Sequence, residues 1–338
     1  MKIATIGLDL AKTVFQLHGI DAEGRVVLRR RLRRSEVVRF LARLSPCLVG
    51  MEACAGAHHW ARTIAGLGHE VRLMPPAYVK AYVRRQKNDL ADAAAICEAV
   101  TRPSMRFVPI KSEAQQAMLL IHRARDLLVR QRTSLINALR AHLAEFGVVL
   151  PNGGHNGRRL PSMLLAGETF GMAAPVVAVL LVMARRCQAL EVEIAQLERE
   201  LRRRAVADAA VRRLVRIPGI GPITATALAA TIADPQSFRS AREFAAWLGL
   251  VPRQSSSGGH ERLGGITKMG HAYLRRLLVV GAQAVLRHAA VKPDNTSPWL
   301  ARLLREKPRK VAAVALANKT ARIVWAVLAR DEAYRSAA

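Results

Sequence analysis

In Lys2-Ile-Ala-Thr-Ile-Gly-Leu-Asp-Leu-Ala-Lys-Thr-Val-Phe-Gln-Leu-His-Gly-Ile20, two apolar runs of strand length flank a short polar segment. This pattern predicts a strand, a tight turn and a returning strand. Outward from this hairpin, short apolar runs alternate with helical stretches, which predicts an α/β layer domain over residues 1–110. Its further strands are expected at Arg25–Arg33, Cys47–Met51 and Val71–Met74, and its helices at Ser35–Leu44, capped by Ser35, at His58–Leu67 and at Ala77–Val100.

The middle of the chain predicts two long helices. Residues 112–147 contain no Gly or Pro before Gly147. The second helix carries an a/d seam, made of Met183, Cys187, Leu190, Ile194, Leu197 and Leu201. We expect the two helices to pair as an antiparallel coiled-coil arm over residues 111–205, although an ordinary bundle core has the same spacing. The Gly/Pro/Asn-rich segment Pro151–Pro161 between them predicts a loop.

Residues 206–338 predict a third, mainly helical domain that carries one Ser/Gly-rich loop at Gln254–Gly265. The fold class expected for the whole chain is therefore α/β plus all-α.

The net positive charge of this chain is unusually large. Its 338 residues (37.0 kDa) include 53 Lys+Arg against 25 Asp+Glu, a formal net charge of +28. The usual partner of so large a positive field is nucleic acid. Aromatic residues are only 4%, which argues against binding of single strands by base stacking alone.

Other classes of protein are disfavoured by composition. Asp9 interrupts the N-terminus before a secretory signal could form, and the near-apolar run Ala173–Ala184 is too short to span a bilayer. The cysteines show no C-x-x-C pairing, which disfavours structural zinc and a disulfide framework. They are Cys47, Cys54, Cys97 and Cys187. We expect a cytoplasmic protein with no membrane partner.

Four carboxylates are candidate catalytic residues. Asp9 ends the first apolar strand, Glu52 follows the strand that ends at Met51, and Asp89 and Asp92 share one face of a predicted helix. Gathered together they would repel one another unless cations bind. Mg²⁺ prefers oxygen ligands, and two such ions about 4 Å apart can clamp an in-line phosphoryl displacement. The pattern therefore predicts a two-metal nuclease-type centre.

Each acid also has a structural interpretation. Asp89 and Asp92 could pair with Arg85 or Lys87 on a solvated face, and Glu52 could be a helix N-terminal residue. The order and context of all four favour the metal centre. Actin-like ATPases and sugar kinases also begin with a strand, a turn and an early Asp. Here the turn supplies only Thr13, no later Gly-rich segment of the kind that binds adenosine follows, and that class leaves the charge unexplained.

Two further segments suit phosphate. Ile217-Pro-Gly-Ile-Gly-Pro-Ile-Thr224 is typical of a helix-hairpin-helix, in which Gly219 and Gly221 expose backbone N–H groups to a DNA phosphate. A plain Gly-rich turn is the alternative. Ser255–Ser257 lie among cations, one of these serines could attack phosphorus, and a Ser-rich solvated linker is the default interpretation. The surrounding cationic and titratable residues are Arg253, His260, Arg262, Lys268, Arg275 and Arg276.

These motifs resemble the transposases of the insertion-sequence 110 family, including the 1111 subgroup, over nearly the whole chain. The resemblance rests on Ile-Gly-Leu-Asp-Leu-Ala-Lys, Met-Glu-Ala-Cys-Ala-Gly, Lys-Asn-Asp-Leu-Ala-Asp-Ala, Ile-Pro-Gly-Ile-Gly, and Gly-Leu-Val-Pro-Arg-Gln-Ser-Ser-Ser-Gly followed by Ile-Thr-Lys-Met-Gly. It implies a RuvC-like, ribonuclease-H-type domain with an Asp-Glu-Asp-Asp tetrad. It also implies a coiled-coil arm and a transposase domain with a catalytic serine. The tetrad positions are Asp9, Glu52, Asp89 and Asp92.

The family serine directly precedes Gly and lies five residues after the Pro of Gly-Leu-x-Pro. Ser257 meets both conditions, and Ser256 is the fallback. We expect phosphate or backbone contacts with nucleic acid from Gly219, Gly221, Arg253, Arg262, Lys268 and Arg275.

The resemblance implies a bacterial, nucleoid-associated recombinase that cuts and rejoins donor and target double-stranded DNA with Mg²⁺. It further implies guidance by a structured non-coding bridge RNA and a homotetramer, a dimer of dimers, with composite sites. Two alternatives remain. One is a Holliday-junction resolvase-like nuclease in which water is the nucleophile, and the other is a non-enzymatic nucleic-acid-binding protein.

Overall fold

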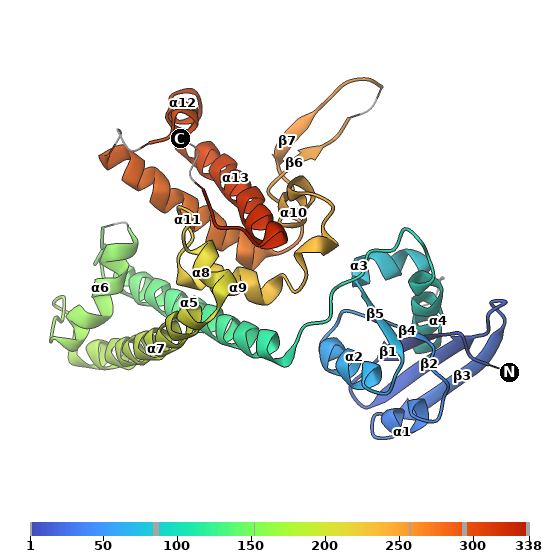
Figure 1. Cartoon of the computed structure of the whole chain (residues 1–338). Helices are drawn as coiled ribbons and strands as arrows, with labels where there is room; N and C mark the ends of the chain where they lie inside the picture. Colours follow the sequence, from blue (N-terminus) through green and yellow to red (C-terminus); the bar gives the residue numbers. More distant parts are fainter. Residues whose placement is uncertain (1, 84–87, 152, 257, 293–295, 336–338) are drawn as a thin grey trace. The chain divides into compact units, whose positions relative to one another are not determined.

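The computed structural model (Figure 1) describes residues 2–83, 88–151, 153–256, 258–292 and 296–335. Contacts between residues divide the chain into two compact units, residues 1–113 and 114–338.

The first unit is built on a five-stranded mixed sheet. Strands β1, β2 and β3 run antiparallel to one another in sequence, and β4 and β5 extend the sheet parallel to β1, in the order β3-β2-β1-β4-β5. The strands are β1 (Thr5–Leu10), β2 (Val14–Ile20), β3 (Val26–Arg33), β4 (Leu48–Glu52) and β5 (Glu70–Met74). Every strand predicted in residues 1–110 is confirmed, and the topology is consistent with the expected ribonuclease-H-type domain.

Helices cover both faces of this sheet (Figure 1). Helices α1 (Val37–Leu41) and α2 (Ala57–Ala65) bury apolar side chains with Leu8 and Met51 on one face. Helix α4 (Asp89–Val100) packs on the other face against β1, β2 and β4. Helix α1 is shorter than predicted and Ser35 does not cap it, because Glu36 occupies the cap position without a side-chain bond.

The single helix predicted over Ala77–Val100 is wrong. A short α3 (Pro76–Val79) continues as a 3₁₀ turn, η1 (Lys80–Tyr82), and Val83 then adopts an extended conformation. Asn88 starts α4 anew, because its side chain accepts a hydrogen bond of 2.8 Å from the amide of Ala91. An N-cap bond of this kind satisfies one of the free amides at a helix start.

The second unit contains the two predicted long helices, α5 (Glu113–Glu145) and α7 (Ala174–Ala207). They lie antiparallel, because in two ion pairs between them the later residue of α5 pairs with the earlier residue of α7. These are Arg125 with Glu198 at 2.6 Å and Arg132 with Glu191 at 3.7 Å. Further along, Leu139 of α5 shares a buried cluster with Ala184 of α7.

The loop predicted over Pro151–Pro161 is wrong, because helix α6 (Gly154–Leu165) occupies most of it and contains Pro161. Leu160 and Leu164, four residues apart, are fully buried against α5 and α7. Burial of this stripe outweighs the low helix propensity of Gly and Pro. Gly157, one turn before Pro161, also lets α6 approach α5, since a Cβ there would meet Ile136 at 3.2 Å.

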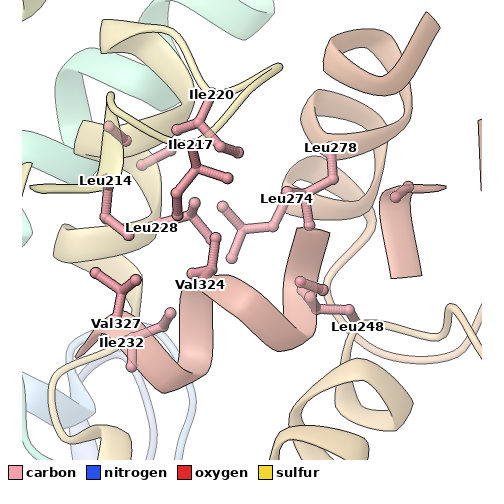
Figure 2. Packing of buried hydrophobic residues seen from close by; sticks show 14 of the residues in the cluster. Leu214, Ile217, Ile220, Leu228, Ile232, Leu248, Leu274, Leu278, Val324 and Val327 are labelled. Atoms are coloured by element: carbon pink, nitrogen blue, oxygen red, sulfur yellow. The ribbon is translucent and has the colours of Figure 1, made fainter. Parts of the chain in front are cut away.

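The rest of the second unit is mainly helical, as expected. Its core gathers side chains from segments far apart in the sequence. Figure 2 shows Leu228 of α9, Leu274 of α11 and Val324 of α13 meeting within it. The helices are α8 (Ala209–Leu214), α9 (Pro222–Thr231), the 3₁₀ turn η2 (Pro235–Ser237), α10 (Ala241–Trp247), α11 (Ala272–Val291), α12 (Pro298–Glu306) and α13 (Arg309–Arg330).

Among the helices in the described ranges, only α13 is long and apolar enough to cross a membrane. One such helix is weak evidence for a membrane protein, because core helices of soluble proteins pass the same test. Ala317, Ala321 and Val324 on its inner side are buried in the core shared with α10 and α11. Packing within the unit therefore accounts for the apolar residues on the inner side of α13.

A buried polar network ties the long helix α5 to α9 and α11. His122 of α5 is 1% exposed, with its Nδ1 3.0 Å from the hydroxyl of Tyr273 and its Nε2 3.1 Å from the hydroxyl of Thr226. The Thr226 hydroxyl donates to the carbonyl of Pro222 at 2.7 Å, so it accepts from Nε2–H, and Nδ1 accepts from Tyr273. Burial, and then the positive charge of Arg125, lowers the pKa of His122 to about 4.

This histidine predicts acid-sensitive stability. The unfolded chain binds a proton below about pH 6.5 that the folded chain refuses until about pH 4, so stability falls as the pH drops through that window. The expected loss is about 3 kcal/mol. Urea unfolding followed by circular dichroism at pH 7 and pH 4.5 measures it. His122→Gln should weaken the pH dependence, and equal dependence in both proteins would contradict the assignment.

Candidate catalytic and nucleic-acid-binding sites

Asp9 and Glu52 lie side by side at the carboxyl ends of two parallel strands. Leu8 of β1 is in register with Met51 of β4, and the two carboxylates are the next residues on their strands. Neighbouring strands are about 4.8 Å apart, so the side chains project as a pair. Both residues are half-buried. The strand-end placement predicted from the sequence is therefore present.

The paired carboxylates face α4. Gly7, two residues before Asp9, lies so close to α4 that a Cβ there would overlap the carbonyl of Ala93. Gly50, two residues before Glu52, leaves only 2.7 Å between a Cβ and the Cβ of Val100. Residues two apart on a strand share a face, so Asp9 and Glu52 lie on the α4 side of the sheet.

The first turn of α4 carries the other two carboxylates, Asp89 and Asp92. The thiol of Cys97 reaches the carbonyl of Thr5 at 3.8 Å, whereas Ala93, one turn earlier, lies over Gly7. Helix α4 therefore runs antiparallel to β1, with its first turn toward the end of the strand that carries Asp9. Acids here are also favoured by the helix dipole. Arg85 and Lys87, their alternative partners, lie outside the described residues.

The four carboxylates do not form a complete metal-binding site as the structure places them. Among the described residues, no group of three or more His, Cys, Asp or Glu is arranged to hold a metal ion. The donor chemistry nevertheless fits a hard divalent cation, because Asp9 and Glu52 supply two carboxylates side by side. Asp89 is exposed and Asp92 half-buried at the start of α4.

Cys54 was missed as a neighbour of this pair. It is exposed two residues after Glu52. Partial desolvation raises the pKa of its thiol, and the negative charges of Glu52 and Asp9 raise it further. Both carboxylates therefore act on the same thiol, which agrees with their placement as a pair. In the sequence, only its position in Met-Glu-Ala-Cys pointed to it.

The glycine that seats α4 predicts a large effect on stability. Gly7→Ala forces α4 away from β1, because the new methyl group overlaps the helix backbone. We expect a loss of about 3 kcal/mol, measured by urea unfolding. Gly66→Ala is the matched control, since its methyl group would meet no backbone atom closer than 3.4 Å at a negative φ. Equal effects of the two substitutions would contradict the close packing of α4.

The predicted serine loop is carried by a two-stranded ribbon, β6 (Pro252–Gln254) and β7 (Leu263–Ile266), which projects from its unit (Figure 1). The amide of Ser255 donates to the carbonyl of Arg262 at 2.9 Å, and the hydroxyl of Ser256 accepts from the amide of Arg262 at 3.2 Å. Ser257, the predicted nucleophile, lies outside the described residues.

The four cations predicted to bind nucleic acid differ in their surroundings. Arg253 is exposed on β6, Arg262 is exposed directly before β7, and Lys268 is exposed beyond the ribbon with a φ of +56°. Arg275 donates to the carbonyls of Leu248 at 2.8 Å and Met269 at 3.0 Å. Arg275 therefore has a structural role at the base of the ribbon, and its contact with nucleic acid stays a prediction.

Two glycines close the base of the ribbon. Gly249 and Gly270 both have positive φ, and a Cβ on either would overlap a backbone carbonyl, that of Met269 or of Trp247. These close contacts explain, in packing terms, why glycine stands in Gly-Leu-Val-Pro and in Lys-Met-Gly.

The glycines of the Ile-Pro-Gly-Ile-Gly segment have unequal surroundings. Gly219, at a φ of +85°, packs against Gly281 of α11, where a Cβ would meet the carbonyl oxygen at 3.0 Å. Gly221 precedes α9, is exposed and has open space around its Cα. The turn between α8 and α9 is thus partly a packing device, and DNA contact through Gly219 or Gly221 stays a prediction.

Comparisons with known proteins now bear on both sites. Residues 6–148 match the DEDD transposase family model of IS110, and residues 211–297 match the model described as "Transposase IS116/IS110/IS902 family". A "probable family 20 transposase" of Pseudomonas aeruginosa is 51% identical over 99% of both chains. The chain belongs to the IS110/IS116/IS902 family of transposases. The expected family is confirmed.

Two further transposases are similar to this chain over most of their length. The transposase for insertion sequence element IS1111A of Coxiella burnetii is 43% identical over 99% of this chain and 92% of its own. That for IS1328 of Yersinia enterocolitica is 42% identical over 96% of both chains. This transposase is thus an enzyme of the class that cleaves and rejoins DNA. Its DEDD domain indicates use of a divalent metal.

Proposed function

We propose that this transposase cuts and rejoins donor and target DNA through a covalent phosphoserine intermediate. Ser257 is the proposed nucleophile, and Asp9, Glu52, Asp89 and Asp92 are the proposed metal-binding carboxylates. The observation that supports the proposal is the pairing of Asp9 with Glu52 at the ends of β1 and β4. Two side-by-side carboxylates repel each other, and a divalent ion bound between them would relieve that repulsion.

The residues have distinct tasks in this proposal. The Ser257 oxygen bonds to phosphorus, one backbone phosphorus–oxygen bond breaks, and the departing nucleoside oxygen takes up a proton. Arg253 and Arg262, exposed on the ribbon, bind the phosphate oxygens by charge-assisted hydrogen bonds. A bound Mg²⁺ would polarise the phosphate and neutralise charge. Rejoining reverses the step when a hydroxyl of another strand displaces Ser257, because the phosphodiester energy is kept in the intermediate.

A structured guide RNA and a homotetramer complete the proposal. A net charge of +28 suits a protein that holds RNA as well as DNA, and 4% aromatic residues leave little for base stacking. Delegating sequence choice to RNA pairing lets the protein read backbone and shape. A homotetramer lets the serine of one subunit meet the carboxylates of another.

Purification from cells carrying the native flanking DNA tests the guide. We expect one discrete RNA, encoded beside the gene and complementary to the junctions of the element. Random cellular RNA, or none, would overturn the guided mechanism and favour a Holliday-junction resolvase-like nuclease. Salt dependence does not separate these mechanisms, because every one of them releases counterions from phosphates.

A further inference from the structure

The edge strand β3 is unusually rich in arginine. Three of its arginines, Arg29, Arg31 and Arg33, alternate along the strand and are exposed. None of the three forms an ion pair within the described ranges of the chain. Strand β3 has a neighbour, β2, on one side only.

The register of the strands places these arginines on the face of the sheet that carries Asp9. Asp9 is paired with Gln16 of β2, and Gln16 is paired with Arg31 of β3. Directly opposite residues in antiparallel strands point to the same face. Arg31 therefore lies on the face of Asp9, two strands or about 10 Å away. Residues two apart share a face, so Arg29 and Arg33 lie there as well.

The neighbouring row of the sheet agrees with this assignment. The row below Asp9 runs from Gly7 to His18 to Arg29, and Gly7 faces α4. Desolvation, and then the positive charge of Arg29, lowers the pKa of His18, which is buried on that face. The charge of Arg29 thus acts on His18, which lies on the face of the sheet that α4 covers.

Arg30 within β3 and Arg34 directly after it face the other way. The guanidinium of Arg30 lies 4.9 Å from the ring centroid of Phe40, and that of Arg34 lies 5.2 Å from the ring centroid of Trp60. Both rings belong to the core between the sheet and α1 and α2. These two arginines are engaged in cation–π contacts, so the strand divides its cations by face.

We propose that Arg29, Arg31 and Arg33, the arginine track, bind the phosphate backbone of the DNA strand whose phosphate is attacked beside Asp9 and Glu52. This inference rests on the proposed function and names the residues that hold the substrate at that site.

The dimensions suit such a backbone. Alternate residues of a strand are about 7 Å apart, so the track spans about 14 Å, which is the rise of about four nucleotides of one DNA strand. Its charge is opposite to that of DNA and of the carboxylates, so it holds phosphates beside a site that would otherwise repel them. The track also lies on an edge that α4 leaves uncovered, because α4 packs on β1, β2 and β4.

The competing explanation is protection of a sheet edge. Charged residues on an edge strand prevent pairing with another chain. Charge on any face of β3 would serve that role, whereas DNA binding at the carboxylates requires charge on the α4 face.

Salt titration of DNA binding separates the two explanations. The track variant of the full-length protein carries Arg29→Gln, Arg31→Gln and Arg33→Gln, and the control carries Arg30→Gln, Arg39→Gln and Arg43→Gln, which removes equal charge near α1. With a 30-base-pair DNA duplex in metal-free buffer, the track variant should bind at least about tenfold more weakly at 0.1 M salt. Its log–log salt slope should fall by about 2 to 3, and that of the control by less than about 1.

Cross-linking gives the position directly. The photoreactive residue p-benzoylphenylalanine replaces Arg31 or, as the control on the opposite face, Arg30. DNA should cross-link from position 31 and not from position 30. Equal slopes and equal cross-linking of the two positions would overturn the track. A loss confined to an RNA duplex probe would overturn DNA as its ligand.

These measurements are independent of cleavage. Failure of the proposed function would appear as strand cleavage that persists in Asp9→Asn, whatever the arginines do. Failure of the track would appear as unaltered binding in the track variant, whatever Asp9 does.

Discussion

Asp9→Asn is expected to abolish DNA strand cleavage, with a rate loss of at least about a thousandfold. The substitution removes one of the two side-by-side charges that are proposed to hold the divalent ion, while the amide keeps the size of the side chain. Cleavage of end-labelled donor DNA, with the RNA that purifies with the protein, measures the effect. Glu98→Gln is the matched control, because Glu98 lies on α4 and pairs with Arg102 at its exposed side.

Stability separates loss of chemistry from loss of fold in this variant. In metal-free buffer, Asp9→Asn relieves repulsion with Glu52, so the urea midpoint should stay the same or rise. Added Mg²⁺ should raise the midpoint of the native protein more than that of the variant. Cleavage at the native rate by Asp9→Asn would remove Asp9 from the metal site.

Ser257→Ala is expected to abolish covalent protein–DNA adducts while RNA and DNA binding survive. The hydroxyl oxygen is the attacking atom in the proposal, so its removal leaves no group to bond to phosphorus. Ser256→Ala is the matched control, since the Ser256 hydroxyl accepts a hydrogen bond from the amide of Arg262 within the ribbon. Denaturing gels of labelled DNA detect the adducts.

The serine control has three informative outcomes. Adducts lost only in Ser257→Ala support the proposal. Adducts lost only in Ser256→Ala would move the nucleophile by one residue. Adducts present in both variants would overturn serine chemistry in this loop.

Most strands of the first unit were predictable because they are short apolar runs with turn residues on both sides, and β3 was predictable because Val and Leu alternate with Arg. The carboxylate pair was predictable for the same reason, since Asp9 and Glu52 end parallel strands that are neighbours. Asn88 is a recognisable N-cap, yet the apolar run across it suggested one helix instead of two. Helix α6 shows the opposite error, because Leu160 and Leu164 gain burial that outweighs Gly and Pro.

Other features depend on contacts that sequence spacing does not reveal. The seating of α4 needs Gly7 and Gly50 to meet residues far along the chain. The network of His122 joins side chains more than one hundred positions apart. Arg29 and Arg31 read only as an exposed basic strand until the register related them to Asp9.

Mass spectrometry of the DNA-linked peptide tests the central claim most directly. Native protein is incubated with donor DNA and its purified RNA, with Mg²⁺ or with chelator, and the adduct is digested with protease and nuclease. We predict a nucleotide on Ser257, formed with Mg²⁺ and absent both with chelator and in Asp9→Asn. Cleaved DNA with free ends and no linked peptide would contradict the account and indicate hydrolysis at the carboxylates alone.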